Sequence, residues 1–171
     1  MTCRMLSASV RVVNARTRMP FRFGIGTLEA LPHLFLEVQA DFDGQRVRAV
    51  AAEGLVPKWF TKHAETSHAE DLAALLEVIR NALELGVELG EQVSPFEFWR
   101  TLYGRQEEWA LGTEHPPLLW NLGVSLVERA MIDGACRAAG VPFGWALRSG
   151  MLGARPGALH RELEGVAWQG L

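Results

Sequence analysis

The sequence lacks the residue patterns that mark several large classes of protein. It has two cysteines, Cys3 and Cys136, too far apart to suggest a disulfide framework, so a reduced cytoplasmic setting is expected. No apolar run approaches the roughly 20 residues that a membrane-spanning helix needs. Residues 1–10 lack the continuous apolar segment of a secretory signal. We therefore expect a soluble cytoplasmic protein that does not enter a membrane.

Charge and catalytic motifs are equally sparse. The chain has 17 Lys and Arg against 20 Asp and Glu, and neither half is strongly basic, which argues against a nucleic-acid partner. The five histidines show no spacing typical of a zinc site. Gly24 and Gly26 lack the third glycine and the strand–turn–helix context of a dinucleotide loop. Ser125 and Ser149 do not stand in nucleophile-elbow sequences.

The 171 residues are enough for one domain, or for one domain and a tail. The hydrophobic fraction of 49% is enough to form a core. Leu34, Leu36 and Val38 alternate with other residues at a period of two, which predicts a strand. A turn signal at residues 41–44 precedes a returning strand, so residues 31–55 are predicted to form an antiparallel hairpin. A first strand around residues 10–16 completes a predicted three-stranded sheet.

The pattern then changes to the period of a helix. Ser67 and Glu70 have the spacing of a capping box, and the leucines that follow fall on one helical face. Gly86 and Gly90 are predicted to end this first helix.

Two further helices are predicted. Residues 94–97 form a second capping box, and that helix is expected to break at Gly104. A third helix is predicted over residues 118–139, ended by Gly140. Strands followed by about three helices, without β–α–β alternation, predict an α+β fold.

Two stretches, residues 18–27 and 52–62, carry the best candidates for binding. We interpret both as loops at the ends of strands, where specificity tends to reside. Aromatic rings would exclude water there, while Arg22 or Lys58 would meet an anionic group such as a carboxylate. The alternative is that the aromatics pack the sheet edge and the cations only keep the surface soluble. The residues concerned are Phe21, Arg22, Phe23, Lys58, Trp59 and Phe60.

The order of these pieces resembles a known domain. A three-stranded meander with a loop after the first and third strands, followed by helices, is similar to the N-terminal capping domain of the enolase superfamily. The likeness is to its mandelate racemase and muconate lactonizing enzyme branch and spans most of residues 8–150. Residues 49–55, with Glu53 and Gly54, resemble the end of that domain's third strand. The residues that fit the pattern of its last helix and exit turn are Ala130, Asp133, Gly140, Pro142, Leu147 and Gly150.

The resemblance implies a role for the two loops. In that family they cap the mouth of a (β/α)-barrel and help to choose a small carboxylate substrate, which would place residues 19–27 and 57–66 there and add Ile25 to the candidates. The barrel supplies a Mg²⁺ held by three acids, together with lysine or histidine bases that take a proton next to the carboxylate. The family's catalytic residues have no counterpart here, so we expect no catalytic residue and no metal ligand on this chain.

The expected organisation is a capping domain at residues 1–150, with a linker or the start of a barrel at residues 151–171. A barrel takes roughly 200 residues or more. We expect the cap to act with a barrel in cis or in trans, to be inactive alone and to form a homo-oligomer. One alternative is a stand-alone interaction or oligomerisation module without enzymatic activity. Another is a self-contained enzyme, which would need Glu53 to meet Glu37 or Asp133 in one cavity.

Overall fold

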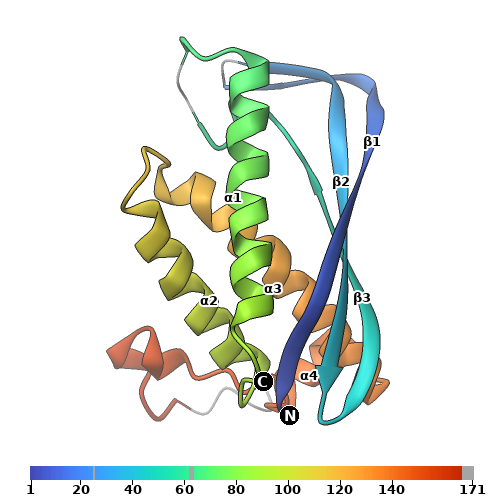
Figure 1. The fold of residues 1–171 in the computed structure, drawn as a ribbon, viewed down its shortest axis with the longest axis vertical. Coiled ribbons are helices and arrows are strands. Elements are labelled where there is room, and N and C mark those ends of the chain that lie inside the picture. The colour runs from blue at the N-terminus through green and yellow to red at the C-terminus, as the bar shows by residue number, and fades with distance from the viewer. Residues whose placement is uncertain (25, 62–63, 167–171) are drawn as a thin grey trace.

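The computed structural model describes residues 1–24, 26–61 and 64–166, in which an antiparallel sheet packs on a layer of helices (Figure 1). The strands are β1 (Cys3–Phe23), β2 (Gly26–Phe42) and β3 (Gln45–Gly54), in the order β1-β2-β3. The helices are α1 (His68–Glu88), α2 (Pro95–Ala110), α3 (Pro117–Ala139) and the short α4 (Phe143–Arg148), followed by the 3₁₀ turns η1 (Pro156–Ala158) and η2 (Arg161–Leu163). The predicted α+β class is confirmed, and the described residues contain no barrel.

The β2–β3 hairpin is as predicted. Asp43 and Gly44 both have positive φ, 50° and 86°, which is the backbone of a two-residue turn that matches the twist of the flanking strands. Alternate residues of β2 face the helices and are completely buried, among them Leu34, Leu36 and Val38. The alternation of buried and other residues along β2 therefore identifies the face of the sheet that packs on the helices and forms the core.

The prediction of a loop at residues 18–27 was wrong for most of that stretch. β1 runs to Phe23 and pairs with β2 up to the pair Phe23–Gly26, so the two strands form one long hairpin. A bulge interrupts the pairing between Arg16 and Phe21, and the Thr17 hydroxyl lies 3.2 Å from two carbonyl oxygens of β2. Pro20 sits in this bulge, where a missing N–H does not break the ladder.

The capping box of α1 is confirmed. The Glu70 N–H donates to Ser67 Oγ at 3.3 Å, and the Ser67 N–H donates to Glu70 Oε2 at 2.7 Å. Gly86, however, does not end the helix. It lies inside α1, where a Cβ would come 2.9 Å from Met5 Sδ, and it lets the helix approach β1; the positive φ of Gly90 follows the end of the helix.

The prediction that α2 breaks at Gly104 was also wrong. Gly104 is exposed, while Leu102 and Gln106 on either side of it are completely buried and hold this turn of the helix against its neighbours. Only half of the second capping box forms: Ser94 Oγ accepts the Glu97 N–H at 3.2 Å. The Glu97 carboxylate instead forms an ion pair with Arg155.

Helix α3 is the centre of the molecule, in contact with the sheet and with both other long helices. Gly123 permits its closest approach to α1, because a Cβ at this position would lie 2.3 Å from the Val78 carbonyl oxygen. Two α3 side chains cover the free edge of β3. Arg129 Nη1 donates to the Ala52 carbonyl at 2.9 Å, and the Val50 N–H donates to Asp133 Oδ2 at 2.9 Å.

In the described part of the chain, no helix has the length and apolar character needed to cross a membrane. Residues after 150 continue to touch the body of the domain: Leu152 is buried, and its carbonyl accepts the Phe96 N–H at 3.1 Å. The division at residue 150 stays a prediction.

Candidate functional site

The tip of the β1–β2 hairpin meets the segment that follows β3. The rings of Phe23 and Trp59 lie edge to face with centroids 5.3 Å apart, and Phe21 stacks beside Phe23 at 6.1 Å. Figure 1 shows this end of the hairpin bending over toward the start of α1. Two stretches that the sequence singled out separately therefore form one aromatic cluster.

This cluster encloses a cavity of about 280 Å³. Its walls are apolar or aromatic apart from one carboxylate, and Phe21 and Trp59 remain 56% and 49% exposed. Gly54 also lines the cavity, and a Cβ there would come 2.6 Å from Leu31 Cδ1, so the Leu31 side chain would have to move. A concave apolar site whose large aromatics are still exposed is suited to a hydrophobic group of another molecule. The lining residues are Phe21, Phe23, Leu28, Glu53, Gly54, Val56, Trp59 and Phe60.

Trp59 is held in place by the residue before it. Lys58 has a positive φ of 67°, a conformation that costs free energy in a residue with a side chain. Its ammonium group lies 3.1 Å from Asp71 Oδ2 and 2.6 Å from Thr66 Oγ1, and the Lys58 and Asp71 side chains are only 11% and 3% exposed. This buried ion pair ties the segment after β3 to the first turn of α1.

The hydroxyl groups of two threonines complete this anchor. Thr66 and Thr61 donate to Asp71 Oδ1 at 2.7 and 3.1 Å. Burial raises the pKa of Asp71, but the hydrogen bonds from Thr66, Lys58 and Thr61 outweigh it, so the pKa lies below its ordinary value. Asp71 is therefore a charged structural anchor, which the sequence did not reveal because its partners are contributed by a different segment.

The predicted cations do not line the cavity. Lys58 points to Asp71, and Arg22 is exposed between Phe21 and Phe23 in the strand, so that its side chain leaves the opposite face. Ile25, the remaining predicted residue, lies outside the described residues. The carboxylate in the wall is Glu53, and its Oε2 lies 2.8 Å from Arg129 Nη2.

Leu28, Gly54 and Val56 were missed by the sequence reasoning. Leu28 lies directly opposite Phe21 in the hairpin, so the pairing of β1 with β2 would have identified it if the strands had been extended to the tip. The alternative of a self-contained enzyme would need Glu53 to meet Glu37 or Asp133, and neither of those acids lines this cavity.

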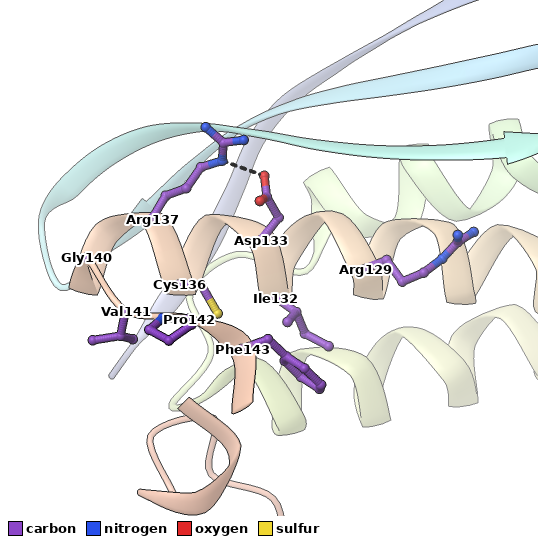
Figure 2. A pocket seen from close by; sticks show the side chains of 9 residues that line it. All are labelled: Arg129, Ile132, Asp133, Cys136, Arg137, Gly140, Val141, Pro142 and Phe143. Atoms are coloured by element: carbon purple, nitrogen blue, oxygen red, sulfur yellow. Dashed lines mark hydrogen bonds and ion pairs between the residues drawn. The ribbon is translucent and has the colours of Figure 1, made fainter. Parts of the chain in front are cut away.

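A second, shallower hollow of about 610 Å³ lies along the C-terminal half of α3 (Figure 2). Figure 2 shows Arg137 and Asp133 turned toward each other, with Nε and Oδ2 2.7 Å apart, while Phe143 and Ile132 form an apolar wall. The other arginine in the hollow, Arg129, pairs with Glu53 of β3. The charged groups are thus already satisfied by residues of the domain.

Glu128 stands on the other side of this wall. It lines a smaller apolar cavity of about 190 Å³, which also includes Ile132 and Phe143, and burial raises the pKa of its carboxyl group. Within the described ranges, no three His, Cys, Asp or Glu side chains come together as metal ligands would.

No protein-family model matches this sequence, and no curated protein matches it. Three similar solved structures each have a TM-score of 0.54. They are an enolase from Bradyrhizobium complexed with magnesium and mandelic acid (16% identity over 84% of this chain), a dipeptide epimerase from Enterococcus faecalis complexed with Mg and the dipeptide L-Leu-L-Tyr (16% over 82%) and a mandelate racemase/muconate lactonizing enzyme from Bordetella bronchiseptica (21% over 87%).

The match covers 34%, 33% and 34% of those three chains, so this chain spans about a third of their length. The shared part is the three-stranded meander with its helices, which confirms the resemblance inferred from the sequence. The chain has the fold of the capping domain of mandelate racemase and muconate lactonizing enzymes of the enolase superfamily.

Proposed function

We propose that this chain is a substrate-capping domain that acts with a (β/α)-barrel, in cis or in trans. The proposed parent reaction is removal of a proton next to a carboxylate, giving racemisation, cycloisomerisation or dehydration. The observation that carries the proposal is the aromatic cavity at the hairpin tip, where residues from two separate stretches meet at 5.3 Å. Loops and tips held on a rigid sheet are suited to shape a binding site.

The cavity is suited to the hydrophobic part of a substrate. Its walls are aromatic or aliphatic apart from Glu53, and the carboxylate of Glu53 is already paired with Arg129. Mandelic acid and L-Leu-L-Tyr, bound in two of the similar structures, each join a carboxylate to hydrophobic groups. In this proposal the cap excludes water and holds that hydrophobic group.

The proposal assigns the substrate carboxylate and the Mg²⁺ to the barrel. Among the described residues there is no cluster of three acids or histidines that fits a metal, and Lys58 is already in contact with Asp71. When bound, Mg²⁺ would stabilise the enediolate formed by proton removal. The contribution of this chain would be to orient the substrate and to close the site.

Kinetics of the protein isolated from its source, together with its barrel, tests the proposal. The assay contains Mg²⁺ and a series of 2-hydroxy acids and dipeptides with hydrophobic groups of increasing size. Trp59→Ala is expected to lower kcat/KM about tenfold or more for the bulky substrates and much less for the smallest ones. The reason is that the binding free energy lost grows with the apolar area that the substrate buries against Trp59. The matched control is Trp109→Ala, since Trp109 packs on His115 and does not line the cavity.

Equal effects of the two tryptophan substitutions would contradict a binding role for the cavity. Turnover by the 171-residue chain without any barrel would contradict the assignment of the chemistry to another domain.

A further inference from the structure

Strand β1 is strongly basic although the chain as a whole is acidic. Its 21 residues include five arginines and no aspartate or glutamate, whereas the whole chain has a net charge of −3. All five arginines are exposed, and none takes part in an ion pair among the described residues. They are Arg4, Arg11, Arg16, Arg18 and Arg22.

β1 is also an edge strand, and the two edges of the sheet differ. On the β3 edge, α3 covers the backbone through Arg129 and Asp133. On the β1 edge, the described residues show one backbone pairing, the bridge between Cys3 and Gln92 at the start of the strand. An uncovered edge presents rows of N–H and C=O groups that another strand can pair with.

The middle of β1 adds exposed apolar side chains on both faces. Val10, Val12 and Val13 are 44%, 49% and 55% exposed. Arg11 lies between them and Arg16 follows them, opposite Phe35 and Ala30 of β2. β-branched residues favour the extended strand conformation, and opposite charges on neighbouring strands attract each other.

The neighbouring acids do not neutralise this strand. On β2, Glu37 is paired with Arg48 at 2.6 Å, whereas Asp41 accepts the Gly44 N–H at 2.8 Å, keeps its charge and lies opposite Arg4, outside residues 8–16. Glu29 is the remaining acid of β2 and is exposed beside the bulge. Two acids, Asp41 and Glu29, against five arginines leave the edge positive.

We propose that the free edge of β1, residues 8–16, binds an extended acidic polypeptide segment as a fourth strand. The backbone of that segment would continue the antiparallel or parallel ladder, and its carboxylates would meet Arg11 and Arg16 on the two faces. A second copy of β1 does not fit, because two strands with five arginines each would repel one another. This inference does not depend on the capping role.

The test uses the 171-residue chain and a synthetic peptide of about twelve residues that alternates glutamate with threonine. Binding is measured by isothermal titration at low ionic strength. Arg11→Glu combined with Arg16→Glu is expected to weaken binding at least about tenfold, because two attractions become repulsions. The matched control is Arg105→Glu, an exposed arginine on α2 that is expected to leave binding unchanged.

A second peptide separates strand pairing from charge alone. It has the same residues, but N-methyl groups block alternate backbone N–H donors, and it is expected not to bind. Equal affinity for both peptides, or equal affinity for heparin, would overturn strand addition in favour of non-specific polyanion binding. Absence of binding by the first peptide would also overturn the proposal. So would a dimer of the chain that this peptide does not dissociate. Circular dichroism establishes that the variants are folded.

Discussion

The ring of Phe23 meets the indole of Trp59 edge to face at 5.3 Å, which joins the tip of the first hairpin to the segment after β3. Edge-to-face aromatic pairs contribute about 0.5–1.5 kcal/mol beyond the area that they bury. The pair depends on the Lys58–Asp71 contact, because that ion pair fixes the backbone next to Trp59. The candidate site is therefore a tertiary arrangement that needs α1 as well as the two stretches that form it.

Asp71→Asn tests this anchor. The substitution removes the carboxylate that Lys58 contacts in a buried position, so we expect the free energy of unfolding near neutral pH to fall by about 3 kcal/mol. The total fluorescence of the six tryptophans is expected to shift slightly toward that of exposed indoles as Trp59 becomes more exposed. Glu107→Gln, at an exposed position on α2, is the control and should change stability little.

Asp71 should also make the free energy of unfolding depend on pH. The pKa of Asp71 is lower in the folded protein than its ordinary value of 3.8, so its stabilising contribution is present above about pH 4 and is lost as the pH falls through the folded pKa. We expect chemical denaturation to show a smaller loss of stability below about pH 4 in Asp71→Asn than in the unchanged protein. Parallel curves for the two proteins would contradict the anchor.

A pair of glycine substitutions tests the helix packing. Gly123→Ala places a Cβ 2.3 Å from the Val78 carbonyl oxygen, so α1 and α3 must separate. We expect a loss of about 2 kcal/mol or more in the free energy of unfolding. At the exposed position 104 of α2, the Cβ added by Gly104→Ala meets nothing within 4 Å, so this substitution should stabilise the protein by about 0.5–1 kcal/mol. Urea denaturation measures both, and a reversed order would contradict the described packing.

The sequence predicted the sheet well because its signals are local. The alternation in β2 and the turn at residues 43–44 depend only on neighbouring residues. The errors arose where tertiary contacts decide: buried Leu102 and Gln106 carry α2 past Gly104, and β2 pairs with β1 up to its tip. Local composition singled out the aromatic residues that line the cavity, whereas the contact of Lys58 with Asp71 is tertiary and could not be predicted from the sequence.

The covered edge of β3 gives another prediction. Asp133→Ala leaves the Val50 N–H without its acceptor at the sheet edge, and we expect stability to fall by about 1–2 kcal/mol, with more self-association of the chain. Asp133→Asn retains a side-chain oxygen that can accept this bond and should lose less. Thermal unfolding and sedimentation velocity measure the two effects; identical behaviour of the two variants would show that the acceptor is unimportant.

Thiol reactivity should distinguish the two cysteines. Burial raises the pKa of Cys3 to about 12, and its side chain is 1% exposed. Burial, followed by the nearby Asp133, also raises the pKa of the partly exposed Cys136. With Ellman's reagent at about pH 8 we expect Cys136 to react slowly and Cys3 to react only on unfolding, because the thiolate is the reactive form. Early modification of Cys3, located by mass spectrometry, would contradict the packing of β1.

The central claim, that this chain caps a barrel, is tested most directly by the intact mass of the native polypeptide and of any chain that co-purifies with it from the source. We expect either a polypeptide well above the 18.9 kDa of these residues, by roughly 200 residues or more, or a separate barrel chain bound to it. A polypeptide of 18.9 kDa that is isolated without any barrel chain would contradict it.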